Sequence, residues 1–194
     1  MIRVVTVLIV VFLSFPTGIG AVAPEAPKTE PNGLARVPTL LDREEQALAL
    51  IGFPWQKLQY DIVFLPPRRG FRAMTLSREN RIEIYARPGD DSHHVAYDIA
   101  HELGHAIDLT TNTREIRQKW LEVRGIDAST PWFGCDGCSD YNTPAGDFAE
   151  TFALLLFGAE HFRGRIAPPP TKDQIPAIIP FFPLDSFKPI PAAN

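Results

Sequence analysis

The spacing of apolar positions changes about halfway along the chain. Between residues 60 and 86 they form short runs, the last of which alternates Ile82 and Ile84 with charged residues, as β-strands do. After residue 92 they recur every three or four positions, which is typical of helices. Strands followed by helices predict an α+β domain with a small antiparallel or mixed sheet, in which a turn at 77–80 makes the last two strands antiparallel neighbours. The expected elements are a helix over 42–51, strands over 60–65, 71–76 and 81–86, and helices over 92–109, 113–123 and 147–157.

Segments of different composition flank the predicted domain at 39–166. Residues 1–23 combine a positive start, an apolar run and small residues before a cleavage position, which predicts a signal peptide. The apolar run is too short to span a bilayer, so we expect a secreted or periplasmic product without stable membrane insertion. Residues 24–38 resemble a proline-rich linker, and 167–194 form a proline-rich tail. Because aromatic residues lie between its prolines, we expect this tail to wrap over the domain as irregular structure.

Charge narrows the range of partners. The 194 residues carry 19 Lys and Arg against 23 Asp and Glu, a net charge of −4, and the basic residues are spread along the chain. Binding to nucleic acid needs a basic face that neutralises phosphates, so the sequence argues against a nucleic-acid partner. The sequence does not indicate an oligomeric state.

The chemistry is concentrated in the segment His101-Glu102-Leu103-Gly104-His105. Two imidazoles four positions apart on a helix project from the same face, so both can bind one Zn²⁺. Glu102 then lies beside the metal, where it can act as general base and then as general acid. Along this helix the ionisable residues fall on one face and the apolar residues on the other. An ordinary amphipathic helix with a polar face toward water has the same pattern, and a metal site differs from it in having a third ligand from elsewhere in the chain.

Catalytic zinc usually takes a third protein ligand, and the apolar helix over 147–157 offers two acidic residues. We predict Glu150 as the ligand because its side chain is longer, and Asp147 as the residue that orients a histidine; the roles could be exchanged. His161 is a remaining candidate for the third ligand. Asp108 is either another residue that orients a zinc histidine or a plain surface carboxylate.

The segments His101–Asp108 and Asp147–Ala153 together resemble the gluzincin-type HExxH zinc metallopeptidases, especially the small secreted group that includes anthrax lethal factor and the Pro-Pro endopeptidases. The resemblance covers about residues 60–160 and implies a zincin-like fold. It also implies that His101, His105 and Glu150 hold zinc, that Glu102 is the base, and that Tyr141 stabilises the oxyanion.

The sequence departs from this family at one point. The family often has two acidic residues four apart on the later helix, with the first as ligand. Here Gly146 stands four positions before Glu150 and Leu154 stands four after it. One of the expected pair is therefore missing, or is replaced by Asp147.

These features predict a secreted zinc metalloendopeptidase that hydrolyses peptide bonds with zinc-activated water. The alternative is a non-catalytic or latent zinc-binding module that uses the same fold to bind a partner. A peptide or protein substrate is expected to pair with an exposed sheet edge, for which 81–86 is the candidate. Cys135 and Cys138, the only cysteines, are predicted to form a local disulfide that stiffens the loop carrying Tyr141.

Overall fold

The computed structural model describes residues 40–134 and 139–182. The predicted signal peptide, the linker and both cysteines lie outside these ranges. The described part is an α+β domain, with three strands followed by most of its helices, as the sequence predicts. The α-helices are α1 Leu40–Leu50, α2 Ser92–Thr111, α3 Arg114–Arg124, α4 Pro144–Phe157 and α5 Ile175–Ile178. None of the helices in this part of the chain is both long and apolar enough to cross a membrane.

The sheet is small and mixed. Its strands are β1 Asp61–Phe64, β2 Ala73–Leu76 and β3 Arg81–Ile84, in the order β1-β3-β2. The predicted hairpin is confirmed, because β2 pairs with β3 in antiparallel register, whereas β1 pairs with β3 in parallel. The strand predicted to receive a substrate peptide, 81–86, is therefore the central strand, whose two edges are already paired. Among the described strands, β1 and β2 are the edge strands, and β2 contacts α2.

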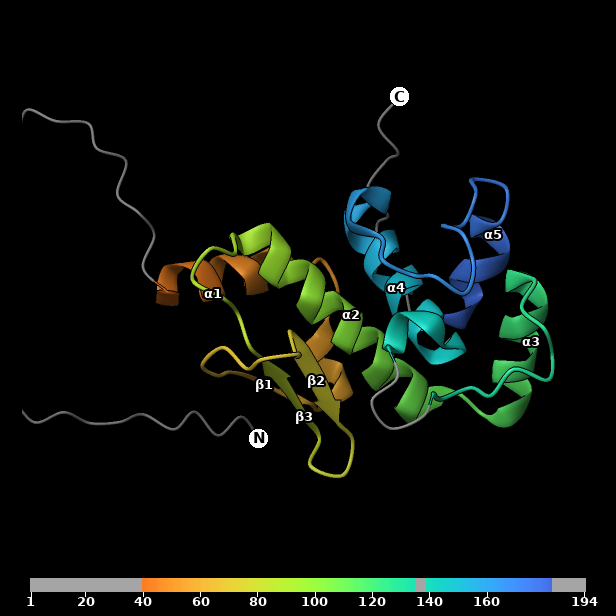
Figure 1. Cartoon of the computed structure of the whole chain (residues 1–194), viewed down its shortest axis with the longest axis horizontal. Coiled ribbons are helices and arrows are strands. Elements are labelled where there is room, and N and C mark those ends of the chain that lie inside the picture. The colour runs from red at the N-terminus through yellow and green to blue at the C-terminus, as the bar shows by residue number, and fades with distance from the viewer. Residues whose placement is uncertain (1–39, 135–138, 183–194) are drawn as a thin grey trace, which may run out of the picture. The chain divides into compact units, whose positions relative to one another are not determined.

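Helix α2 lies between the sheet and α4 and runs through the middle of the domain (Figure 1). Its contact with α4 is unusually close at Gly104, where an added Cβ atom would lie 2.6 Å from the Cα atom of Ala149. A larger residue at this position would push the helices apart. The glycine inside the histidine motif therefore brings α4, and with it Glu150, up to the face of α2 that carries the two histidines.

Helix α4 begins one turn earlier than predicted. Thr143 caps it by accepting a hydrogen bond from the backbone N–H of Gly146, and Pro144 occupies the first helical position. A proline there has the φ angle that a helix needs and lacks only an N–H that would have had no partner. As a result, Asp147 and Glu150 lie in the first two turns of α4.

The described part of the proline-rich tail belongs to the core. Ile178 and Phe182 are buried, and the Phe182 ring packs against the rings of Trp120 and Phe148. The segment wraps over the domain as expected, but it contains the short helix α5 where irregular structure was predicted. The predicted boundary between domain and tail, at residue 166, thus divides a single packed unit.

Candidate metal centre

The two histidines of the motif lie one turn apart on α2 and face the same way. Their ring centroids are 4.9 Å apart, and their Nε2 atoms are 3.2 Å apart. His101 is buried and His105 is nearly so. The helical spacing alone produces this pair, because residues four apart on a helix lie above one another.

A third potential ligand atom belongs to Asp140, a residue that was not predicted from the sequence. Its Oδ2 atom lies 3.0 Å from Nε2 of His101 and 3.1 Å from Nε2 of His105. These two histidines and Asp140 form a possible metal-binding triad. Asp140 begins a short 3₁₀ helix, Asp140–Asn142, just before α4. An aspartate before a helix usually caps it, so the sequence contains no signal that marks this one as a ligand.

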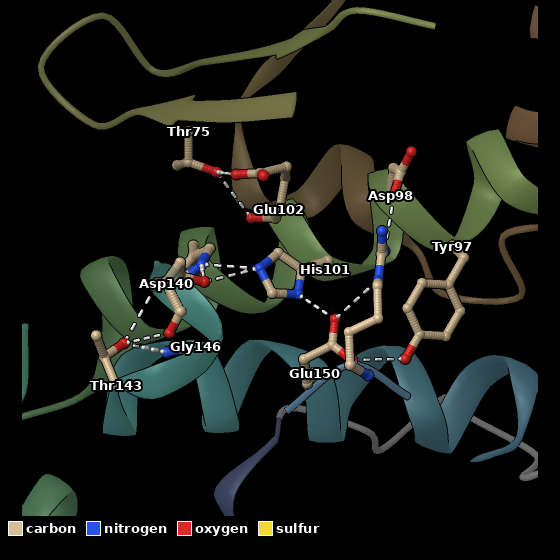
Figure 2. Close-up of polar contacts among 11 residues, drawn as sticks. Thr75, Tyr97, Asp98, His101, Glu102, Asp140, Thr143, Gly146 and Glu150 are labelled. Atoms are coloured by element: carbon tan, nitrogen blue, oxygen red, sulfur yellow. Dashed lines mark hydrogen bonds and ion pairs between the residues drawn. The ribbon is translucent and has the colours of Figure 1, made fainter. Parts of the chain in front are cut away.

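Glu150 approaches the same histidine from the opposite side. Its Oε1 atom lies 2.9 Å from Nδ1 of His101, and since a carboxylate only accepts hydrogen bonds, the ring N–H donates. Its Oε2 atom accepts from the Tyr97 hydroxyl at 3.0 Å and from the backbone N–H of Arg163 at 2.6 Å. The structure thus brings Glu150 to the site as the residue that orients His101, and not to the two Nε2 atoms (Figure 2).

Asp147 does not contact either motif histidine. Its two carboxylate oxygens accept from the guanidinium of Arg124 at 2.8 and 2.9 Å, and one of them also accepts from the indole N–H of Trp120 at 3.0 Å. The orienting role that the sequence analysis assigned to Asp147 belongs to Glu150 in the structure. Asp147 instead neutralises a buried arginine.

Gly146 leaves space for the Asp140 segment. A Cβ atom added to Gly146 would lie 2.1 Å from the carbonyl oxygen of Asp140 and 2.7 Å from its Oδ2 atom. Any side chain at position 146 would displace the Asp140 carboxylate from the histidines. The hydroxyl of Thr143 donates to the same Asp140 carbonyl at 2.8 Å and helps to hold the turn. Gly146 is the position, four residues before Glu150, at which the family often has an acidic residue. Here it has no side chain, and the carboxylate of Asp140 occupies the space beside it.

The electrostatics of the metal-free centre favour a protonated His101. Burial opposes its charge, but hydrogen bonds to Asp140 and Glu150 outweigh burial and raise the pKa of His101 to about 10. Burial also acts to raise the pKa of Asp140, yet its bonds to the two histidines hold that pKa well below its usual range. The imidazolium ring of His101 is thus stabilised between the two carboxylates.

Glu102 lies on the cleft side of α2. The hydroxyl of Thr75 on β2 donates to its Oε2 atom at 2.7 Å (Figure 2). A cleft of about 630 Å³ opens here, and its walls include Thr75, Glu102 and all three residues of the triad. The carboxylate therefore faces the same open space as the three potential ligand atoms.

Tyr141 also lines the cleft. Its ring lies 5.5 Å from the His101 ring, and the guanidinium of Arg163 lies 5.2 Å from its ring centroid. Burial raises the pKa of Tyr141 to about 12, although the charge of Arg163 acts in the opposite direction. The hydroxyl is therefore neutral at ordinary pH and can donate a hydrogen bond.

Two other candidates lie away from the triad. The ring of His161 packs against those of Tyr97 and His94 and lines a different pocket from the triad. Asp108 is fully buried, and it accepts from the Arg117 guanidinium, the Trp132 indole and the Asn112 amide. Asp108 is thus neither a surface carboxylate nor a partner of a motif histidine, but part of the contact between α2 and α3.

Comparison of the chain with protein-family models, with curated proteins and with solved structures finds no match.

Proposed function

We propose that this protein is a zinc-dependent peptidase with a zincin-like fold. The observation that carries the proposal is the convergence of three potential ligand atoms, from His101, His105 and Asp140, with pairwise distances of 3.0, 3.1 and 3.2 Å. Ligand atoms that lie about 2.0 Å from a tetrahedral Zn²⁺ are roughly 3.3 Å apart. The three donors therefore fit one face of a zinc coordination tetrahedron.

The chemistry of the donors supports zinc in a catalytic site. Two imidazoles and one carboxylate are one of the known protein ligand sets of catalytic zinc, and they leave the fourth position for water or substrate. Glu150 supports His101 from behind, as the partners of metal-binding histidines commonly do. The cleft lies in front of the triad, so the fourth position would be accessible.

In the proposed mechanism, the metal supplies Lewis acidity that polarises the substrate carbonyl and lowers the pKa of a water molecule. Glu102 accepts the proton of that nucleophilic water and then delivers it to the leaving amine. The hydrogen bond from Thr75 holds the Glu102 carboxylate on the cleft side. One carboxylate thus serves both proton transfers.

The negative charge that develops on the carbonyl oxygen needs a second donor. Tyr141 is the candidate, because it lines the cleft beside His101 and its raised pKa keeps the hydroxyl protonated. Arg163 packs on the Tyr141 ring and also supports Glu150 through its backbone N–H. The loop after α4 thereby links the oxyanion donor to the residue that orients His101.

The substrate would bind as an extended strand. The edge strand β2 contributes Ala73, Met74 and Thr75 to the wall of the cleft. An edge strand has unpaired backbone groups that can pair with a peptide. The peptide would then cross the front of the metal centre with its backbone held by β2.

Elemental analysis and mutagenesis test this proposal. We expect about one zinc per folded chain, loss of metal in Asp140→Ala, and unchanged metal content in the control Asp173→Ala, which removes an exposed carboxylate elsewhere. Glu102→Gln should keep the metal and lose hydrolysis of a mixed peptide library. Retention of full zinc in Asp140→Ala would contradict the assigned ligand.

Binding of metal by the folded chain without cleavage of any peptide would favour the alternative, a non-catalytic zinc-binding module.

A latent enzyme, whose cleft is covered by its own tail, has no support from the described part of the tail. Residues 168–182 contribute none of the residues that line the cleft, and Phe182 packs against Phe148 and Phe152 of α4. Export remains a proposal that rests on the sequence pattern of residues 1–23.

A further inference from the structure

Exposed apolar side chains gather at the cleft. The described residues include five large apolar side chains that are well exposed, and three of these, Phe71, Leu109 and Phe133, line the cleft. Phe71 is 39% exposed and Phe133 is 49% exposed. Single exposed apolar residues are normal on a protein surface, but several around one cleft indicate a binding function.

An arginine holds the Phe71 ring in place. The guanidinium of Arg68 lies 4.3 Å from the centroid of this ring, and it also donates to the hydroxyl of Tyr85 at 3.3 Å. The Tyr85 ring itself lies 6.5 Å from that of Phe71. A cation–π contact and a neighbouring ring thus restrict the motion of an exposed aromatic residue.

Phe133 has the same kind of support at the other end of the cleft. The guanidinium of Arg117 lies 5.0 Å from the centroid of its ring. Arg117 is fixed in turn by two hydrogen bonds to the buried carboxylate of Asp108, both 3.0 Å long. Both aromatic rings are therefore ordered before any ligand arrives, which lowers the entropic cost of binding.

The two rings lie on opposite sides of the metal centre. Phe71 lies near Asp98 of α2, because the next residue, Arg72, pairs with Asp98. Phe133 lies near Asp108 and Leu109, further along α2, because Arg117 packs on its ring and bonds to Asp108. Eleven residues of helix separate Asp98 from Leu109, which is about 16 Å. An extended peptide of about five residues covers this length.

We propose that Phe71 and Phe133 determine substrate specificity, selecting extended peptides with large apolar side chains on both sides of the scissile bond. This inference rests on the proposed peptidase function. The motif histidines lie between the two rings along α2, so a peptide held on β2 with its scissile bond at the metal places one flanking side chain near each ring.

Cleavage profiling of a peptide library with the mature full-length chain tests the inference. Wild type should prefer Leu, Met or Phe over Ser and Asn at one position or more on each side of the cleaved bond. Phe133→Ala should lower kcat/KM for such peptides by about tenfold or more on one side, and Phe71→Ala on the other. Peptides that already carry Ala there should be affected little.

Leu65→Ala is the matched control, because Leu65 is 38% exposed and does not line the cleft. It should cleave every peptide as wild type does. Cleavage without apolar preference, or an equal loss on all peptides in Phe133→Ala, would overturn the specificity role and leave the peptidase function intact.

Absence of cleavage by the zinc-loaded wild type would instead contradict the peptidase function. In that case a binding assay tests the specificity role of the two rings separately. Its probes are a fluorescent peptide with flanking Leu residues and its counterpart with flanking Ser residues. Tighter binding of the Leu-flanked peptide, lost in Phe133→Ala and kept in Leu65→Ala, would support recognition by the rings. Equal binding of the two peptides would overturn it.

Discussion

Two fully buried carboxylates lie about one turn apart on α4 and have different partners. Asp147 pairs with the guanidinium of Arg124, which is itself buried, and with the Trp120 indole. Glu150 accepts from the His101 ring, the Tyr97 hydroxyl and a backbone N–H. Both satisfy the requirement that a buried charge be compensated.

The two carboxylates differ in the chemistry of their partners. Arg124 is permanently charged, has no access to the cleft, and ties Asp147 to α3 and the tail. His101 has a second ring nitrogen that faces Asp140 and the cleft, so the hydrogen bond from Glu150 also orients a potential metal ligand. One carboxylate therefore stabilises the fold and the other supports the site.

Asp147→Asn should have the largest effect, and on folding alone. It leaves the buried Arg124 without its ionic partner, so we expect the free energy of unfolding to fall by about 3–5 kcal/mol. Urea denaturation of the metal-free chain, followed by tryptophan fluorescence, measures this loss. Zinc affinity of the folded variant should match wild type, and a loss below about 1 kcal/mol would contradict the assigned role.

Glu150→Gln should reverse this pattern. Its side chain keeps its size but no longer offers two anionic oxygens to His101, Tyr97 and Arg163, so we expect zinc affinity to fall by about 10- to 100-fold. Competition with a chromophoric chelator measures the affinity. If Asp147→Asn weakens zinc binding as much as Glu150→Gln does, the division of roles on α4 is wrong.

Raising the pH should strengthen metal binding. Because the pKa of His101 is raised to about 10 in the metal-free chain, the metal must displace a proton. The apparent affinity should therefore rise about tenfold per unit between pH 7 and pH 8. Chelator competition at several pH values measures this slope, and an affinity independent of pH would contradict it.

The same shift in pKa affects the stability of the metal-free chain. The folded pKa of His101 lies above the unfolded value of about 6.5, so its contribution is complete below that pH and is lost as the pH rises toward 10. The Tm of the metal-free chain should therefore fall between pH 7 and pH 9. Asp147→Asn should keep this dependence and Glu150→Gln should reduce it.

Tyr97→Phe should have the smallest effect. It removes one of the two donors to Oε2 of Glu150 and leaves the backbone N–H of Arg163 in place. One hydrogen bond contributes about 0.5–1.5 kcal/mol, so zinc affinity should fall roughly three- to tenfold. An affinity equal to that of wild type would show that Arg163 alone holds Glu150.

The fold was predicted well where the pattern is local. The three strands, the hairpin and helices α2 and α3 lie within three residues of their expected bounds, since periodicity and turn residues define them. The order of the strands was not predicted, because nothing in residues 81–86 indicates that β1 would pair with their free edge. The predicted substrate edge, 81–86, is therefore the central strand of the sheet, and β2 is an edge strand.

The sequence by itself determined that His101 and His105 share one face of a helix with Glu102 beside them, because helical rise and rotation are the same in every protein. It also determined that Asp147 and Glu150 would be buried and would need partners. Only the tertiary structure decided which partners they have. The close packing at Gly104 brings Glu150 behind His101, and Gly146 leaves room for Asp140 in front of it. The contacts that result join His101 to residues 49 and 39 positions further along the chain.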